Sequence, residues 1–298
     1  MRAMLRRLKN DAIWLLVRGA VAVVARVPAA WHGWLGDRLA ALALRLAPGE
    51  RRRAAGQLAA AFGHAVDGPV VRTLLRGTFR ELARNALALA GLNGRSRPEL
   101  PGLTDPARRI LDAARATGRG AVFFTGHLGN WELLAITLAQ HGYPVTVVGR
   151  PSYDPRFTAL VDGLRGRFGV EVVARGEPGS AARLLRALRA GRFLGVLIDQ
   201  DTSLPGVFVP FFGRLAHTPV GPAELARRTG AVPLAGWLRR RRDGGATIVV
   251  ERLEDCADAA ALTARATRRL EAWIRERPSQ WVWLHDRWRT RPATEVAS

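Results

Sequence analysis

The sequence predicts an α/β fold, with a mostly parallel sheet flanked by helices and preceded by an N-terminal helical segment. Three observations support this class. Six short runs are almost wholly apolar, as strands buried on both faces of a sheet are. Amphipathic stretches of helical length separate most of these runs, which is the order of elements that builds a parallel sheet. The 298 residues are 48% hydrophobic and 24% charged, a composition that indicates a folded globular chain and excludes a disordered one.

The individual elements follow from apolar runs and helix-boundary residues. Helical periodicity predicts helix over residues 50–92, and the segment 93–101 has the composition of a loop. The six expected strands span residues 121–125, 145–148, 170–173, 193–198, 231–237 and 247–250. Three further helices are predicted from N-cap and C-terminal glycine signals: from Asp105 to near Gly118, from Ser180 to near Gly191, and from Thr218 to near Gly230.

A basic segment that contains tryptophan opens the chain. Arg18 and Arg26 interrupt its apolar run, so the charge-free stretches fall far short of the roughly 20 residues of a spanning helix. Arginine inside the run also argues against a signal peptide. We expect residues 1–47 to form a helix in, or dipping into, an anionic membrane surface. The alternative is an amphipathic helix packed on the protein's own core. Residues 48–298 are expected to form a further domain, helical over 48–104 and α/β over 105–298.

The charge is the most unusual feature of the composition. The chain has 46 basic and 25 acidic residues, a net charge of +21, and therefore predicts an anionic partner: nucleic acid, phospholipid headgroups or an acidic carrier protein. No zinc-finger spacing, aromatic–basic recognition motif or Gly-Lys phosphate loop supports the nucleic-acid alternative. A single cysteine, Cys256, excludes an internal disulfide and a cysteine-bound metal cluster.

The segment Thr125–Leu134 carries the strongest candidate chemistry. Ligand sites in open α/β sheets lie beyond the carboxyl ends of strands, and this segment joins an expected strand to an expected helix. It contains His127 and Glu132, whose side chains would lie about 140° apart on a regular helix. They can meet if His127 occupies the turn, with Asn130 as the N-cap of the helix. A carboxylate beside an imidazole yields a general base that can deprotonate a hydroxyl. The alternative is a helix-capping histidine and a surface glutamate.

The motifs of this chain, taken in order, resemble one known family. The segment Gly126–Leu134 is similar to the His-x4-acid motif of membrane acyltransferases, in the form found in bacterial lipid A biosynthesis acyltransferases. The similarity continues through residues 143–151, 167–170, 198–201, 206–213 and 278–292, so it covers nearly the whole chain. It implies a glycerolipid-acyltransferase-like fold whose catalytic domain is residues 48–298.

The resemblance also implies the reaction and the roles of particular residues. It implies transfer of a fatty acyl chain from acyl carrier protein, or from acyl-CoA, to a hydroxyl of a lipid A precursor. His127 would be the base and Glu132 the residue that orients it. The expected substrate-binding residues are Arg150, Asp199, Asp201 and Arg214. One aspartate is expected to shape the site and the other to hold Arg150 or a neighbour, with loop-starting Asx turns as the alternative for both.

The expected partners follow from the same family. They are acyl carrier protein, a glycolipid acceptor and an anionic membrane surface, with no nucleic acid, no metal and no resident cofactor. The expected location is the bacterial inner membrane, with the active site on the cytoplasmic side. Other glycolipids or phospholipids, including mannosylated inositol lipids, remain alternative acceptors, and a catalytically inactive membrane scaffold of the same fold is a further alternative.

Other histidines and tryptophans carry weaker signals. Besides His127, the histidines show no metal-ligand spacing and receive no role; they include His217 and His285. Trp281, Trp283 and Trp288 are expected to pack on the core, or alternatively to line a groove for an acyl chain.

Overall fold

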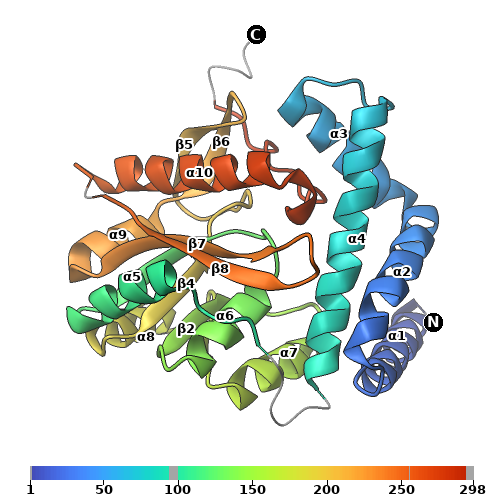
Figure 1. The fold of residues 1–298 in the computed structure, drawn as a ribbon, viewed down its shortest axis with the longest axis horizontal. Helices are drawn as coiled ribbons and strands as arrows, with labels where there is room; N and C mark the ends of the chain where they lie inside the picture. Colours follow the sequence, from blue (N-terminus) through green and yellow to red (C-terminus); the bar gives the residue numbers. More distant parts are fainter. Residues whose placement is uncertain (1, 94–99, 255, 293–298) are drawn as a thin grey trace.

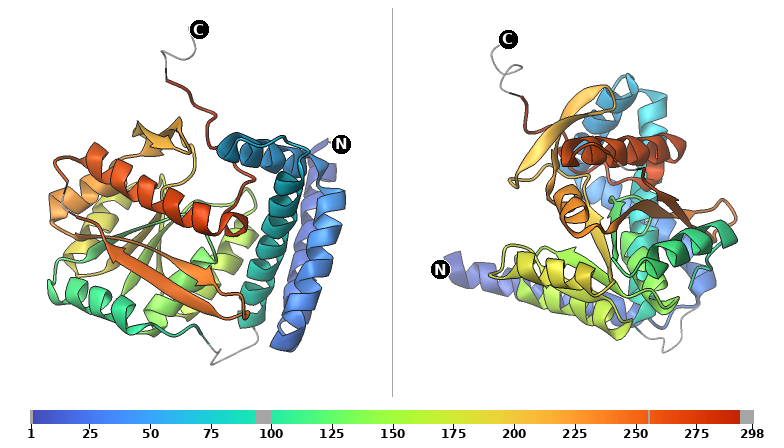
Figure 2. Two further views of the ribbon diagram at one scale, coloured as in Figure 1. Left: turned by 45° about the horizontal axis from the view of Figure 1, so that its top comes forward. Right: turned by 90° about the vertical axis from the view of Figure 1, so that its left-hand side faces the viewer.

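The computed structural model describes residues 2–93, 100–254 and 256–292. Its first part is a helical layer that stands at one end of the α/β part (Figures 1 and 2). This layer comprises α1 (Arg2–Val24), the short η1 (Ala29–Trp31), α2 (His32–Leu46), α3 (Pro48–Phe62) and α4 (Pro69–Leu92). The helical stretch expected over 50–92 is therefore two helices, because Gly63 ends α3 in the left-handed conformation at φ 67°.

A six-stranded sheet forms the centre of the α/β part. Its strand order is β3-β2-β4-β1-β7-β8, and every neighbouring pair is parallel except β7–β8. The strands are β1 (Ala121–Thr125), β2 (Val145–Gly149), β3 (Glu171–Ala174), β4 (Phe193–Leu197), β7 (Val232–Arg240) and β8 (Ala246–Arg252). All six expected strands are found, and the predicted class, a mostly parallel sheet flanked by helices, is confirmed.

Helices cover both faces of this sheet, which explains why its strands are mostly apolar. Val122 and Phe124 of β1 belong to one hydrophobic core, and Ala121 and Phe123 belong to the other, because successive side chains of a strand point to opposite faces. The first core contains residues of α8 (Ser180–Arg189), α9 (Gly221–Thr229) and α10 (Ala259–Glu276). The second contains residues of α5 (Asp105–Ala116), α6 (Trp131–Gln140) and α7 (Pro155–Arg167).

Local signals misplaced the start of one helix and the N-caps of two others. The helix expected from Thr218 begins at Gly221, since residues Arg214–Pro219 form β6, which pairs with β5 (Gly206–Phe211) as an antiparallel hairpin. The cap of α5 is Thr104, one residue before the expected Asp105, and its hydroxyl accepts a hydrogen bond from the N–H of Ala107. Ser180 begins α8 but does not cap it, because its hydroxyl donates to backbone carbonyls before the helix.

The helical layer presents many apolar side chains to solvent. Those on α1 include Leu8, Leu15 and Leu16, and those on η1 and α2 include Trp31, Trp34, Leu42 and Leu46. Within the described residues, no helix combines the length and the apolar character needed to cross a membrane. An ion pair of 2.7 Å between Asp11 and Arg156 joins α1 to the start of α7, beside the loop that follows β2. Of the loop expected over 93–101, residues 94–99 lie outside the described part, as do residues 293–298 of the expected α/β domain.

Candidate active site

The site lies at the carboxyl edge of the sheet, where two adjacent parallel strands end side by side. Thr125 at the end of β1 pairs with Leu197 at the end of β4. His127 and Asp199 each follow two residues later, so the sheet brings them together from positions 72 residues apart in sequence. This adjacency depends on β4 lying next to β1, which the strand order provides.

His127 and Asp199 form a hydrogen-bonded pair. The Nδ1 atom of His127 lies 2.9 Å from Oδ1 of Asp199, whose side chain is 1% exposed. The other carboxylate oxygen, Oδ2, accepts hydrogen bonds from the backbone N–H of His127 at 2.6 Å and from the indole Nε1–H of Trp281 at 2.7 Å. Burial alone would favour the protonated acid, but the charge and hydrogen bonds of His127, together with the Trp281 bond, hold the pKa of Asp199 below its ordinary value. An ionised carboxylate only accepts hydrogen bonds, so it places the imidazole proton on Nδ1 and leaves a lone pair on Nε2.

Two glycines allow the turn that carries His127 to fit against its neighbours. A Cβ atom on Gly126 would lie 2.8 Å from Oδ2 of Asp199. Gly129 has φ 64°, and its Cβ would meet the carbonyl oxygen of Leu238 at 1.9 Å. Asn130 caps α6, as predicted, because its side-chain oxygen accepts a hydrogen bond from the N–H of Leu133 at 3.0 Å. The site turn, residues 126–130, therefore has its shape fixed at both ends.

The residue predicted to orient His127 makes a different contact. Glu132 lies in the first turn of α6, and its carboxylate accepts from the Arg165 guanidinium at 2.8 Å and 2.5 Å. Arg165 also binds Asp162 at 2.8 Å. The structure thus corrects the expected His127–Glu132 pair. Asp199, arriving from the adjacent strand, occupies the Nδ1 position, while the Glu132 carboxylate lies against a largely buried arginine.

Two residues without a predicted role, Gln200 and His285, also contact the imidazole of His127. The side-chain nitrogen of Gln200 lies 3.1 Å from Nε2 of His127 and 2.6 Å from Nε2 of His285. The two imidazole rings are 5.0 Å apart between centroids. Burial, and the nearby charges of His127 and Arg53, lower the pKa of His285 to about 4, so this ring is neutral at pH 7. Gln200 stands between the two aspartates that the sequence singled out, whereas His285 reaches the site only through the fold of the C-terminal segment.

The other predicted binding residues surround the site without joining its hydrogen-bonded centre. Asp201 binds the C-terminal segment, where it accepts from the backbone N–H of Thr290 at 2.6 Å and from its hydroxyl at 2.9 Å. Arg150 is exposed just after β2, and its side chain has no polar partner among the described residues, so neither aspartate holds it. Arg214 lies over the ring of Trp288, with its guanidinium carbon 4.8 Å from the ring centroid.

An apolar cavity opens beside His127. It lies between α6 and the strands β1, β2 and β4, with Thr125 and Trp131 near the histidine; the Trp131 ring is 4.8 Å from the imidazole. Most of its other lining residues are apolar: Phe123, Leu134, Ala135, Leu138, Val145, Val147, Val148, Phe193, Gly195 and Leu197. The Glu132–Arg165 ion pair is the charged part of the lining. The lining of this cavity therefore suits an apolar group rather than a polar one.

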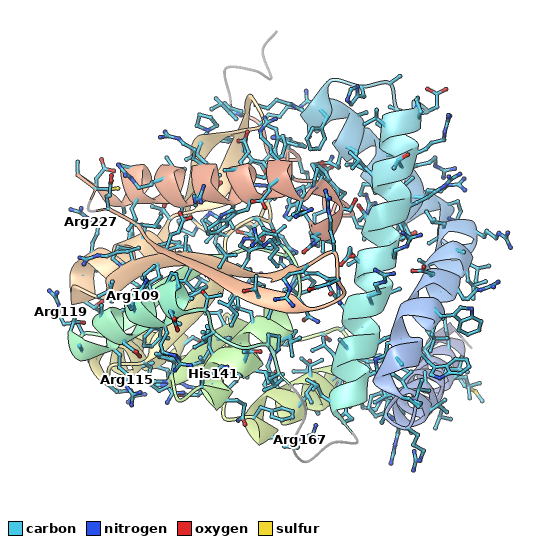
Figure 3. The ribbon with its side chains drawn as sticks, in the orientation of Figure 1. Arg109, Arg115, Arg119, His141, Arg167 and Arg227 are labelled. Atoms are coloured by element: carbon cyan, nitrogen blue, oxygen red, sulfur yellow. The ribbon has the colours of Figure 1, made fainter. Side chains whose placement is uncertain are left out.

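Basic side chains are not confined to this edge of the molecule. Arg119 precedes β1, at the opposite edge of the sheet, and Arg115, Arg119 and Arg227 lie along the side of the molecule away from the helical layer (Figure 3). The described residues contain no cluster of three or more histidine, cysteine or acidic side chains suited to hold a metal ion.

Comparison with known proteins identifies the family. Residues 2–290 match the model of the bacterial lipid A biosynthesis acyltransferases. The chain belongs to this family, and the resemblance seen in its motifs is confirmed.

Individual relatives carry two kinds of name. The chain is 35% identical over 185 residues to a phosphatidylinositol mannoside acyltransferase of Mycobacterium tuberculosis, a match covering 60% of this chain and 57% of the relative. It is 32% identical over 171 residues to the lipid A biosynthesis lauroyltransferase of Escherichia coli, covering 54% and 55%. It is 24% identical over 290 residues to the lipid A biosynthesis myristoyltransferase of the same organism, covering 95% and 88%. The matched part is thus under three-fifths of the length of the first two relatives.

Proposed function

We propose that this protein is an O-acyltransferase that moves a fatty acyl chain from a thioester donor to a hydroxyl group of a glycolipid, with His127 as the general base. The His127–Asp199 pair is the observation that carries the proposal. Because Asp199 holds the proton on Nδ1, the lone pair of Nε2 is available to a hydroxyl donor. The amide of Gln200, 3.1 Å from Nε2, occupies a position that such a hydroxyl can take.

The proposed reaction needs no resident cofactor. Nε2 accepts the proton of the acceptor hydroxyl as its oxygen attacks the thioester carbonyl carbon. The carbon–sulfur bond then breaks, the protonated imidazole returns the proton to the leaving sulfur, and the products are an ester and a free thiol. Asp199 remains ionised throughout and stabilises the charged imidazole, which its depressed pKa supports.

The apolar cavity is the proposed acyl-chain site. Gly195 of β4 lines it, and a Cβ atom there would have its nearest neighbour, Cγ1 of Val147, at 3.4 Å. Gly195→Val should therefore fill the cavity from the strand without a backbone collision. We expect the variant to prefer acyl chains shorter by several carbons, measured by mass spectrometry of products formed from an equimolar mixture of donors. An unchanged preference would contradict this assignment.

The proposed location is the cytoplasmic side of the bacterial inner membrane. Exposed apolar side chains of α1 and α2, together with the net charge of +21, support binding to an anionic lipid surface. Leu15→Glu combined with Leu16→Glu places two charges at exposed apolar positions of α1. We expect wild type, but not this variant, to float with vesicles that contain phosphatidylglycerol. Equal flotation of both would contradict the assignment of α1 as the membrane contact.

The proposed donor is acyl carrier protein, an acidic protein whose charge complements this chain, with acyl-CoA as the alternative. The proposed acceptor is a lipid A precursor, supported by the family match and by the names of the Escherichia coli relatives. The names of the mycobacterial relatives support a phosphatidylinositol mannoside instead.

A product assay distinguishes these substrates. Purified enzyme is given lauroyl or myristoyl chains on either carrier, together with a lipid A precursor, a phosphatidylinositol mannoside or a phospholipid. The proposal expects a mass gain of one acyl chain on the lipid A precursor, with the carrier protein as the better donor. A gain on another lipid alone would contradict the acceptor, and no gain on any lipid would contradict O-acyl transfer.

A further inference from the structure

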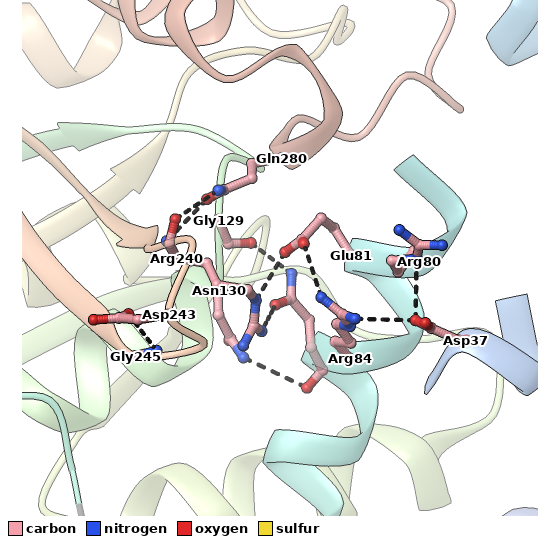
Figure 4. Close-up of polar contacts among 11 residues, drawn as sticks. Asp37, Arg80, Glu81, Arg84, Gly129, Asn130, Arg240, Asp243, Gly245 and Gln280 are labelled. Atoms are coloured by element: carbon pink, nitrogen blue, oxygen red, sulfur yellow. Dashed lines mark hydrogen bonds and ion pairs between the residues drawn. The ribbon is translucent and has the colours of Figure 1, made fainter. Parts of the chain in front are cut away.

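The site turn is held at Gly129 by hydrogen bonds to both of its backbone polar groups. The Gly129 N–H donates to the carbonyl of Gln280 at 2.8 Å. The carbonyl of Gly129, which is labelled in Figure 4, accepts from the side-chain amide of Asn85 at 2.7 Å. Asn85 belongs to α4, in the helical layer, and is 8% exposed. A side chain outside the α/β part thus binds the peptide two residues beyond His127.

The orientation of the Asn85 amide is itself fixed. The guanidinium Nη2 of Arg240 donates to Oδ1 of Asn85 at 3.0 Å, which directs the amide nitrogen towards Gly129. Arg240 is held in turn, because its Nε donates to Glu81 at 2.8 Å. The side chain of Gln280 makes two hydrogen bonds of 2.9 Å with the backbone of Arg240. The contacts close a ring around the turn, which Figure 4 shows between α4 and the end of β7.

Asn85 also contacts the residue that caps α6. The side-chain nitrogen of Asn130 lies 3.4 Å from the backbone carbonyl of Asn85. The turn is therefore bound to α4 at two successive residues, while Asp199 and Trp281 hold its other end. Local capping explains the start of α6, but it does not explain why a buried asparagine of α4, itself held by Arg240, is directed at the Gly129 carbonyl.

We propose that Asn85 is a positioning residue for His127. Through its hydrogen bond to Gly129, it holds the site turn in the position at which Nδ1 of His127 reaches the Asp199 carboxylate. The inference rests on the proposed role of His127 as the base. Loss of the amide donor leaves the buried Gly129 carbonyl without its partner, so the turn relaxes towards another donor. Small displacements of a catalytic group are costly, since a shift of about 1 Å can lower a rate about 100-fold.

The substitution Asn85→Asp tests this most sharply. The side chain keeps its shape and can still accept from Arg240, but an ionised carboxylate cannot donate to the Gly129 carbonyl. We expect kcat for lauroyl transfer from acyl carrier protein to a lipid A precursor to fall roughly 10- to 100-fold, with KM for both substrates within about twofold of wild type. Arg80→Ala is the matched control, because Arg80 lies on the same helix, is half exposed and binds Asp37 rather than the turn. It should leave both constants unchanged.

A second measurement does not depend on turnover. In histidine-labelled protein, the ring signals of His127 are identified by their absence in His127→Ala, and we expect them to move in Asn85→Asp but not in Arg80→Ala. Wild-type kcat together with unmoved His127 signals would overturn the proposal, as would equal losses in Asn85→Asp and the control. Full activity of His127→Ala would refute the proposed base instead, and the ring signals alone would then decide whether Asn85 positions the turn.

If Asn85→Asp does not fold, Arg240→Lys takes its place, because it releases Oδ1 of Asn85 while keeping a positive charge near Glu81. Unchanged kcat and ring signals in that variant would also overturn the proposal.

Discussion

Replacing Asp199 with asparagine tests the geometry of the His127–Asp199 pair, because the structure dictates how the new amide must sit. Oδ2 of Asp199 accepts from two N–H donors, the backbone of His127 and the indole of Trp281. An asparagine has to place its carbonyl oxygen there and its NH2 group on Nδ1 of His127. That NH2 group needs an acceptor, so Nδ1 loses its proton and Nε2 carries it. The imidazole is then in the tautomer that cannot accept a proton from a hydroxyl.

The expected loss in Asp199→Asn is the full contribution of the base, roughly 10²–10⁴-fold in kcat. This corresponds to about 3–5 kcal/mol of transition-state stabilisation. The fold should persist, since both N–H donors keep an acceptor. The assay is the initial rate of acyl transfer at several substrate concentrations, with melting temperature measured alongside. Asp243→Asn is the matched control, as its side chain binds Arg241 and the N–H of Gly245 rather than His127. Turnover of Asp199→Asn within a few-fold of wild type, in folded protein, would refute the tautomer argument.

Two further predictions concern the surroundings of the pair. Gly126→Ala should lower turnover and cost about 1–3 kcal/mol of stability in thermal melts, because its Cβ would lie 2.8 Å from the Asp199 carboxylate. Gly163→Ala is the control: its added Cβ meets open space, so it should be neutral or slightly stabilising in the same melts. His285 has a folded pKa of about 4, below the ordinary 6.5, so the unfolded chain binds its proton more readily and stability falls as pH drops between those values. Relative to His285→Gln, wild type should lose about 3 kcal/mol between pH 6.5 and pH 4 in denaturant titrations. Parallel stability curves for the two proteins would show that His285 does not titrate in this way.

The sequence predicted the sheet well because its strands are buried on both faces. A run such as Ala121–Thr125 lacks the alternation of apolar and polar residues that is typical of a surface strand, and it lacks the periodicity of an amphipathic helix. Glycines then mark where such runs end. The hairpin Gly206–Pro219 was harder to recognise. Its second strand ends in Thr218 and Pro219, a pair that also signals the start of a helix, and pairing with β5 overrides that local signal.

Only the part of the site that lies within one short segment of the chain could be predicted from the sequence. His127 and the capping Asn130 lie in one short segment, and the glycines of that segment predict its turn. The carboxylate that binds His127 is set by the adjacency of β1 and β4, which a linear pattern does not contain, so the nearer Glu132 was favoured over Asp199. Gln200 and His285 were missed for the same reason, since Gln200 follows β4, His285 lies in the C-terminal segment, and only the fold brings either to His127.

The most direct test of the account is the mass of the product made by wild type and by His127→Ala under identical conditions. Each protein is incubated with lauroyl or myristoyl acyl carrier protein, a lipid A precursor and detergent, and the lipids are weighed by mass spectrometry. We expect a gain of one acyl chain with wild type and a loss of most or all of that product in the variant. Equal product from both proteins would contradict His127 as the base that this fold positions.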